Sequence, residues 1–370
     1  MVNIRIIKTL LLGVVLACTA CKSSVLVKKE IDIRFLDEYI FTETQKFEGS
    51  LIGGLSGLDY QSSTDSYFIV CDDATNPRYY KAKINIANSE IRSISFDSIF
   101  YLKPNVTLDS IILDLESVRI FNNNKLLFAS EGSIKYQKNP VIFEKSFLKS
   151  RFNFYKLPDY FSADSTSTNQ PRHNGVFESI AINPNQKGFW VATEIPLKRD
   201  GAEPSFTSDR APIRVTYFDK KTRVATKQFT YLPDQLSKKP GKNFAVNGVT
   251  SMLQLSTHRF LMLEREFVAG YGTQGNNVRI YLADIANTTN TLNQNILNKS
   301  IFTAQKTLLF DFEKVRDQLT QNSIDNIEGM TFGPLLKNGN LSLLLVADNN
   351  FNPPTEQLNQ FLLLELLNYK

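Results

Sequence analysis

The chain of 370 residues carries 42 Lys and Arg against 37 Asp and Glu, a balance that gives no electrostatic reason to expect a nucleic-acid partner. Two of its three cysteines lie within the first 21 residues, so a disulfide framework is excluded and stability must come from the core. The third, Cys71, lies in the apolar run YFIVCDD and is expected to be a small core residue.

Residues 1–21 have the layout of a secretory signal. Arg5 and Lys8 precede an apolar run from 9 to 17, and small residues with cysteine follow. The run is too short to span a bilayer as a helix. We therefore predict that residues 1–20 are a lipoprotein-type signal peptide and that residues 21–30 form a tether.

Lipid attachment is expected at Cys21, because the small Thr19 and Ala20 precede it and the polar stretch CKSS begins there. Cys18 is the alternative attachment site. This interpretation predicts an exported protein that is anchored at the bacterial cell envelope through its N-terminal lipid only. The anchored protein could face the periplasm or the outside, and we expect it to be a monomer. The alternative is a soluble secreted protein that is cut nearby.

A loosely repeated unit follows along the rest of the chain. Each copy opens a strand with a polar residue followed by a small one, turns, and ends a second apolar strand in a carboxylate. The five copies span residues 54–73, 115–132, 177–194, 246–266 and 327–350. Their openings fall at Ser56, Glu116, Glu178, Asn247 and Glu328. A repeat of this length indicates one unit arranged radially or stacked, because one copy cannot bury its own apolar face.

Each interval between openings has room for four strands. The first interval predicts strands at 54–61, 66–73, 78–86 and 91–102, and the third and fourth intervals divide in the same way. The last interval offers only 328–336, 341–348 and 360–367, so residues 31–41 are expected to supply its fourth strand. The sequence thus predicts one all-β domain over 31–370, a β-propeller of five four-stranded blades closed by its two ends. Six blades are the alternative, and a short helix is expected at 312–321.

Acidic residues recur where a propeller would bring them together. The opening glutamates should converge near the axis, and the carboxylates that end the second strands should share one face. These second-strand residues are Asp72, Asp73, Glu131, Glu194, Glu264, Glu266 and Asp348. Crowded carboxylates need protons, cationic side chains or a hard cation, and Ca²⁺ is the cation that such oxygen ligands suit best. The predicted metal ligands are Glu116, Glu178, Glu328, Glu264 and Asp348.

Basic residues stand beside several of these acids. Lys198 and Arg199 follow Glu194, and Arg265 lies between two glutamates. Cations next to metal-bound carboxylates are what a phosphate ester requires. The predicted catalytic residues are Glu178, Glu328, Glu194, Arg265, Lys198 and Arg199. The alternative is purely structural, with the acids capping strand ends or pairing with Arg119 and the other cations.

The ordered motifs resemble the phytase-like family described as "esterase-like activity of phytase". The motifs are GLSGLDY (54–60), ESVRI with FASEG (116–132), NGVFESIAINP with FWVATE (174–194), VTSMLQLSTHRFLMLERE (249–266) and IEGMTFGP with LLLVADNNF (327–351). The resemblance covers roughly residues 50–365 and implies a propeller that hydrolyses phosphate esters. Motif matching would place Glu116, Glu178, Glu328, Glu194, Glu264, Arg265 and Asp348 at its site. Neutral residues at Ser56 and Asn247 depart from the family's Glu-Gly or Glu-Ser opening.

Two functions from different classes therefore remain open. The first is a Ca²⁺-dependent hydrolase of soluble phosphomonoesters that uses metal-activated water. The second is a non-catalytic propeller that binds a ligand or a protein partner in the envelope, with a structural calcium. A single-metal carboxylester or lactone hydrolase is a third possibility.

Overall fold

The computed structural model describes residues 31–102, 111–121, 124–147, 151–163, 171–207, 210–242 and 244–369. The predicted signal peptide, the tether and both candidate lipidation sites, Cys18 and Cys21, lie outside the described residues. In the described ranges, no helix is both long and apolar enough to cross a membrane.

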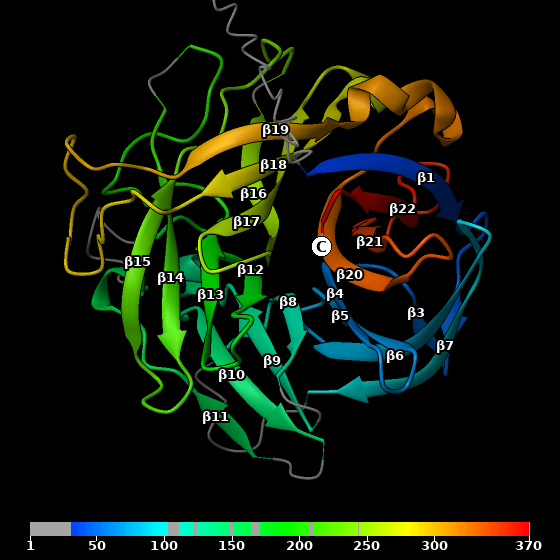
Figure 1. The fold of residues 1–370 in the computed structure, drawn as a ribbon, viewed down its shortest axis with the longest axis horizontal. Coiled ribbons are helices and arrows are strands. Elements are labelled where there is room, and N and C mark those ends of the chain that lie inside the picture. Colours follow the sequence, from blue (N-terminus) through cyan, green and yellow to red (C-terminus); the bar gives the residue numbers. More distant parts are fainter. Residues whose placement is uncertain are drawn as a thin grey trace, which may run out of the picture. The chain divides into compact units, whose positions relative to one another are not determined.

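Five antiparallel four-stranded sheets make up the described domain (Figure 1). Blade 1 contains β4 (Gly57–Gln61), β5 (Ser66–Cys71), β6 (Arg78–Ala87) and β7 (Glu90–Tyr101). Blade 2 contains β8 (Leu115–Ile120), β9 (Lys125–Ser130), β10 (Val141–Ser146) and β11 (Phe152–Phe154). Blade 3 contains β12 (Phe177–Ile182), β13 (Gly188–Thr193), β14 (Ile213–Asp219) and β15 (Ala225–Tyr231). Blade 4 contains β16 (Ala245–Gln254), β17 (Arg259–Val268), β18 (Asn276–Asp284) and β19 (Gln305–Asp311).

Blade 5 joins the two ends of the domain. It contains β20 (Ile327–Leu335), β21 (Leu341–Ala347), β22 (Gln360–Leu367) and, as its outer strand, β1 (Asp32–Ile40). β1 pairs antiparallel with β22 from Asp32 opposite Leu367 to Ile40 opposite Gln360. The first strand of each blade contacts the first strands of both neighbouring blades, which closes the ring around an axis (Figure 1). The five-bladed propeller and its closure by the terminal strands are therefore confirmed.

The core lies between neighbouring blades. One apolar cluster packs Leu363 of β22 against Leu58 and Tyr80 of blade 1, and a similar cluster joins each other adjacent pair. Cys71 is fully buried in the cluster between blades 5 and 1, and burial raises the pKa of its thiol to about 12. Its predicted role as a small core residue is confirmed.

Short elements complete the described chain. They are the ribbon of β2 (Lys46–Phe47) and β3 (Ser50–Leu51) and the 3₁₀ helices η2 (Ile134–Tyr136), η3 (Asp159–Phe161), η4 (Gly272–Gln274), η5 (Phe312–Gln318) and η6 (Thr320–Asn322). The short helix expected at 312–321 is thus a 3₁₀ helix that ends earlier. Asp311 caps its N-terminus by accepting from the backbone N–H of Glu313 at 3.0 Å.

The inner strands of blades 2 to 5 share one irregularity. The pairing register shifts at Glu116 in β8, at Glu178 in β12 and at Glu328 in β20, so each opening glutamate lies at a β-bulge. In β16 the same shift falls at Thr250. The expectation that Asn247 opens the fourth copy is wrong by three residues, because the bulge, and not the Asn-Gly sequence, defines the equivalent position.

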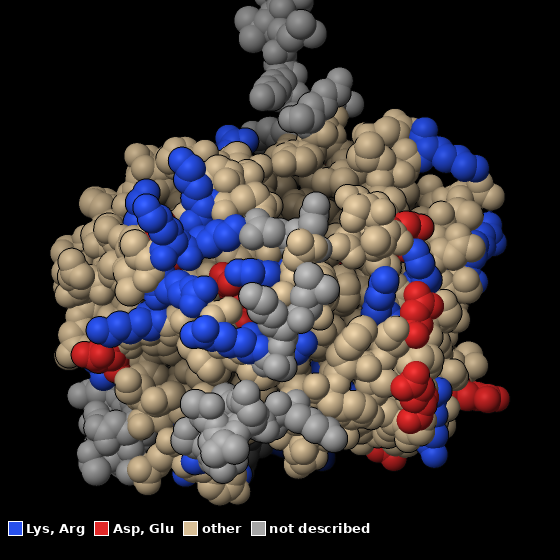
Figure 2. All heavy atoms as spheres, turned by 90° about the horizontal axis from the view of Figure 1, so that it is seen from below, with Lys and Arg blue, Asp and Glu red and all other residues tan. Residues whose placement is uncertain are grey.

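Charged side chains on the outer surface are unevenly distributed. Seen from below, Lys and Arg gather on one half of the face, whereas most Asp and Glu lie on the other half (Figure 2). The opening glutamates Glu178 and Glu328 are buried, so the exposed pattern is separate from them.

Candidate metal and active site

Two sets of equivalent positions meet where the inner strands begin. The bulge positions of blades 2 to 5 hold, in order, Glu116, Glu178, Thr250 and Glu328, and Ser56, which directly precedes β4, takes the corresponding place in blade 1. The position at the end of each second strand holds Asp72, Glu131, Glu194, Arg265 and Asp348. Four of these second-strand residues donate a backbone N–H across to the inner strand at 2.9–3.0 Å, and Arg265 pairs with Gly248 at the corresponding place. Blade 4 therefore presents a hydroxyl and a guanidinium, whereas blades 2, 3 and 5 present a carboxylate at both positions.

The two neutral bulge residues connect neighbouring blades. The hydroxyl of Ser56 donates to the carbonyl oxygen of Leu115 at 2.6 Å, and that of Thr250 donates to the carbonyl oxygen of Ile327 at 3.1 Å. Each hydroxyl thus fastens its blade to the start of the next inner strand. Glutamate occupies this position in the three other blades, so the acids are concentrated in blades 2, 3 and 5.

The densest group of acids lies in blade 2. One carboxylate oxygen each from Asp114, Glu116 and Glu131 lies within 4.8 Å of the others. Asp114 is a residue that the repeat pattern missed, because it precedes the opening. Its spacing of two from Glu116 was the available signal, since alternate residues of an extended segment share one side.

Burial and mutual repulsion raise the pKa of every carboxyl in the group. Burial, followed by repulsion from Glu178, holds the pKa of Glu116 well above its usual range, and burial with repulsion from neighbouring acids raises the pKa values of Glu178 and Glu328 in the same way. Burial also raises the pKa of Glu131 to about 8 and that of Asp114 to about 7. These groups hold protons near neutral pH unless a cation replaces them.

The same effect extends to blades 1 and 5. Burial raises the pKa of Asp348 to about 8 and that of Asp72 to about 6. Repulsion from Asp72 contributes to the shift of Asp348, and repulsion from Asp73 contributes to that of Asp72. Asn326 donates from Nδ2 to Glu328 at 2.9 Å and to Asp348 at 3.4 Å. The Oδ1 atom of Asp72 is buried and finds no donor among the described residues.

Arg265 supplies positive charge to this group. Its Nη2 lies 3.1 Å from Oε1 of Glu194 and 3.5 Å from Oε1 of Glu328, so it joins blades 3, 4 and 5. Its Nε is buried and finds no acceptor within the described part of the chain. One guanidinium cannot neutralise all the acids, so the remaining carboxyls need protons or a bound cation to offset their charge.

Glu131 and Glu178 form a linked pair. Glu131 Oε1 accepts from the backbone N–H of Gly175 at 2.7 Å and from that of Val176. A hydrogen bond from Glu178 also stabilises the ionised form of Glu131. A hydrogen bond between two carboxyls requires one of them to carry a proton, so this pair can hold a proton at the junction of blades 2 and 3.

Three of the predicted site residues lie elsewhere. Successive side chains of β17 point to opposite sides, so Glu264 and Glu266 face away from the side to which Arg265 points. Glu264 accepts from Tyr231, Lys306 and the backbone N–H of Asp234. Lys198 is exposed, and Arg199 contacts Asn295. The geometry does not bring Glu264, Lys198 or Arg199 into the axial group, and their functional roles remain predictions.

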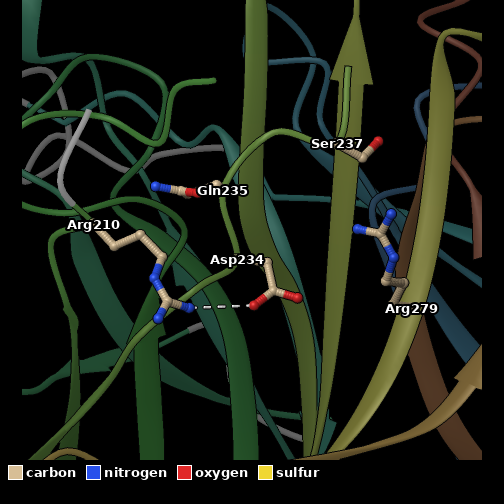
Figure 3. Close-up of a pocket in the computed structure, with 5 residues that line it drawn as sticks. All are labelled: Arg210, Asp234, Gln235, Ser237 and Arg279. Carbon is tan, nitrogen blue, oxygen red and sulfur yellow. Dashed lines mark hydrogen bonds and ion pairs between the residues drawn. The ribbon is translucent and has the colours of Figure 1, made fainter. Parts of the chain in front are cut away.

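A pocket of about 410 Å³ is lined by Asp234 and Ser237, whose backbone N–H groups donate to Glu264 and Glu266 (Figure 3). Arg210 pairs with Asp234 there, and Arg279, which pairs with Glu266 at 3.3 Å, lies across from them beside Ser237. Two arginines and one aspartate line this pocket, so cations outnumber acids in its walls, unlike in the axial group.

Arg119 closes the axis beyond the acids. Its side chain is buried and donates to carbonyl oxygens on the inner strands of all four other blades. The acceptors are those of Leu58 (2.6 Å), Ile180 (2.7 Å), Met330 (3.0 Å) and Met252 (3.3 Å). These four residues are equivalent, each two positions beyond its bulge, so the guanidinium must lie on the axis.

The fold and this site define a five-bladed propeller with a buried carboxylate group at one end of its axis. The chain belongs to the phytase-like family, whose model, described as "Esterase-like activity of phytase", matches residues 50–351. The expected family membership is thus confirmed. No curated protein matches the sequence.

Several solved structures are similar to this chain at low identity. The endo-arabinase from Bacteroides thetaiotaomicron is 11% identical with a TM-score of 0.43, and the match covers 89% of this chain and 93% of that one. A chain of the nidogen/laminin complex is 7% identical with a TM-score of 0.39, and the match covers 89% of this chain and 96% of that one. The Dos1 propeller is 11% identical with a TM-score of 0.37, and the match covers 86% of this chain and 71% of that one.

Proposed function

We propose that this protein is a phosphoric-ester hydrolase that depends on a divalent cation, most simply Ca²⁺, held by the axial carboxylates. The observation that carries the proposal is the group of Asp114, Glu116 and Glu131, whose ligand oxygens lie within 4.8 Å of one another. Family membership supports a hydrolase role.

The residues present fit a hard cation. The donors are carboxylate oxygens, which Ca²⁺ prefers, and neither histidine nor cysteine competes among the residues named for the group. The unpartnered Oδ1 of Asp72 is a further buried oxygen close to Asp114 and Asp348. A bound cation would lower the pKa of a coordinated water and offset the charge of a phosphate group.

The chain's own residues supply the remaining functions. Arg265 has a free Nε–H beside its two carboxylate partners, which suits it to hold a phosphate oxygen. The proton shared by Glu131 and Glu178 can pass to the leaving-group oxygen as the P–O ester bond breaks. The attacking water forms the new P–O bond and returns a proton to the same pair, so the site ends as it began.

A panel of phosphomonoesters, assayed first with calcium and then with EDTA, tests the proposal. We expect turnover of at least one member, loss of turnover on chelation and recovery on readdition of calcium. Absence of turnover across the panel, or turnover indifferent to EDTA, would contradict the mechanism. The same proposal places the protein at the cell envelope through a lipid on Cys21, which mass spectrometry of the mature N-terminus would detect.

The second candidate is a non-catalytic propeller in which the cation is structural. The contacts of Glu131 with the backbone of Gly175 and Val176 favour it, because they make the acidic group part of the junction between blades 2 and 3. This role would be favoured if the wild-type protein turned over no ester and the Glu178→Gln variant lost both calcium binding and thermal stability.

A further inference from the structure

A second cavity lies at the other end of the axis. It has a volume of about 270 Å³, and Arg119 and Asp59 line it. Its walls include one equivalent residue from each blade, four positions beyond the bulge: Tyr60, Ile120, Ile182, Gln254 and Phe332. The acids lie at or before the bulges, so Arg119 separates this cavity from the axial group.

The charges facing the cavity cancel. The donors of Arg119 are committed to four carbonyl oxygens, and its Nη1 lies 3.7 Å from Asp59. Asp59 accepts from the hydroxyl of Thr331 and the backbone N–H of Ile120, and 18% of its side chain remains exposed, so its oxygens can still be reached. The cavity therefore favours a neutral ligand that offers hydrogen-bond donors over an anion.

Gln254 is the polar member of the wall set. Only 6% of Gln254 is exposed. Its Nε2 donates to the carbonyl oxygen of Ser256 at 2.9 Å. Its Oε1 finds no donor among the described residues, although it belongs to a side chain that lines the cavity. A buried amide oxygen without a donor is unfavourable, and a ligand hydroxyl would satisfy it if the amide turned toward the cavity and gave up its bond to Ser256.

The other wall residues specify the rest of the ligand. Tyr60 and Phe332 offer aromatic surface, whereas Ser62, Ser63 and Gln186 at the rim offer hydroxyl and amide groups. The walls thus combine aromatic and aliphatic surface with more polar groups than most small-molecule sites have, and the volume lies just below the usual range for such sites. A monosaccharide has both an apolar ring face and several hydroxyls.

We propose that this cavity binds a neutral monosaccharide, with Asp59 and Gln254 as acceptors for its hydroxyls. This site is separate from the proposed phosphoester site and does not depend on it. The inference rests on the cavity, the matched charges and the unpartnered amide oxygen.

Saturation-transfer NMR and calorimetry with D-glucose, D-galactose, D-xylose and D-mannose test the proposal on the mature protein. We expect at least one of these sugars to bind, and Gln254→Leu to weaken that binding by about tenfold or more, the effect of one lost hydrogen bond in a buried site. Gln305→Leu, on the exposed face of β19, is the matched control and should leave binding unchanged.

Glu178→Gln separates the two ends of the axis. It should leave sugar binding unchanged, because Glu178 lies on the acidic side of Arg119. The proposal is overturned if none of the four sugars binds, if binding survives Gln254→Leu in a protein with unchanged circular dichroism, or if inorganic phosphate binds in their place. Should Gln254→Leu fail to fold, Gln254→Glu, which replaces the amide by a carboxylate of similar shape, should also change the affinity.

Discussion

Arg265 in β17 donates from Nη2 to Oε1 of Glu194, at the end of β13, over 3.1 Å. The two residues occupy equivalent positions in neighbouring blades, so this ion pair forms because blade 4 carries a cation where blade 3 carries an acid. Arg265 also lies 3.5 Å from Glu328 of blade 5. One substitution in the repeat thus supplies a counter-charge to acids on both sides.

Replacement of Arg265 by methionine should destabilise the protein by about 3–5 kcal/mol at neutral pH, because it leaves Glu194 and Glu328 buried without their partner. Urea unfolding in EDTA would measure the change. The loss should be smaller near pH 5, where more of the carboxyls are protonated, and Lys198→Met, at an exposed position, should have little effect. An equal loss at both pH values would contradict the electrostatic explanation.

Without metal, stability should fall as the pH rises from about 4 to about 8. The folded state raises the pKa of Asp72 to about 6, of Asp114 to about 7 and of Glu131 and Asp348 to about 8, so over this window it binds more protons than the unfolded chain. Below about pH 4 both states are protonated and the dependence disappears.

Calcium should flatten this pH profile, because a bound cation stabilises the ionised carboxyls. Unfolding midpoints measured across the window, in EDTA and in calcium, give the comparison. A metal-free protein that gains stability as the pH rises through this window would show that the carboxyls are not held in their protonated form.

Calcium affinity should depend on Glu116 and not on Glu264. Glu116 lies within the group of three acids, whereas Glu264 is occupied by Tyr231 and Lys306. Glu116→Gln should weaken calcium binding by about 10- to 100-fold, by analogy with the loss caused by altered metal sites. Glu264→Gln should leave the calcium affinity unchanged, as measured by calorimetry on protein verified as folded. If both variants lost calcium affinity to the same extent, Glu264 would be a metal ligand as the sequence predicts.

Arg119→Met should destabilise the protein by about 3–5 kcal/mol, because four buried carbonyl oxygens lose their donor and Asp59 loses its counter-charge. The exposed pair of Arg92 and Glu90 provides the control, and Arg92→Met should change stability by less than about 0.5 kcal/mol. Chemical denaturation of both variants decides the matter. A change for Arg119→Met as small as that for the control would mean that the axial hydrogen bonds do not hold the blades together.

Thr250→Val should cost about 1 kcal/mol, since it removes the hydroxyl that donates to the carbonyl oxygen of Ile327. Thr250→Ser keeps the hydroxyl and should retain more of the stability. Thermal unfolding of the pair isolates the contribution of the bond between blades 4 and 5. A serine variant less stable than the valine variant would indicate that the methyl group, and not the hydroxyl, is the important contact.

The sequence by itself favoured five blades over six and determined most of the strands within them and the pairing of the two terminal strands, β1 and β22. These follow from alternation and apolar runs, which are local, and from a repeat whose intervals are similar in length. It also indicated the acids at Glu116, Glu178 and Glu328, because they stand at the same point of each copy.

Only the tertiary structure decided which acids form one group. The bulge in β16 moves the fourth opening from Asn247 to Thr250, and the strand alternation of β17 brings Arg265 to the axis while it turns Glu264 away. Bulge position and strand register depend on packing between blades, to which residues far apart in the sequence contribute. The axial role of Arg119 has the same origin, because its four acceptors are backbone carbonyls, which carry no signature in the sequence.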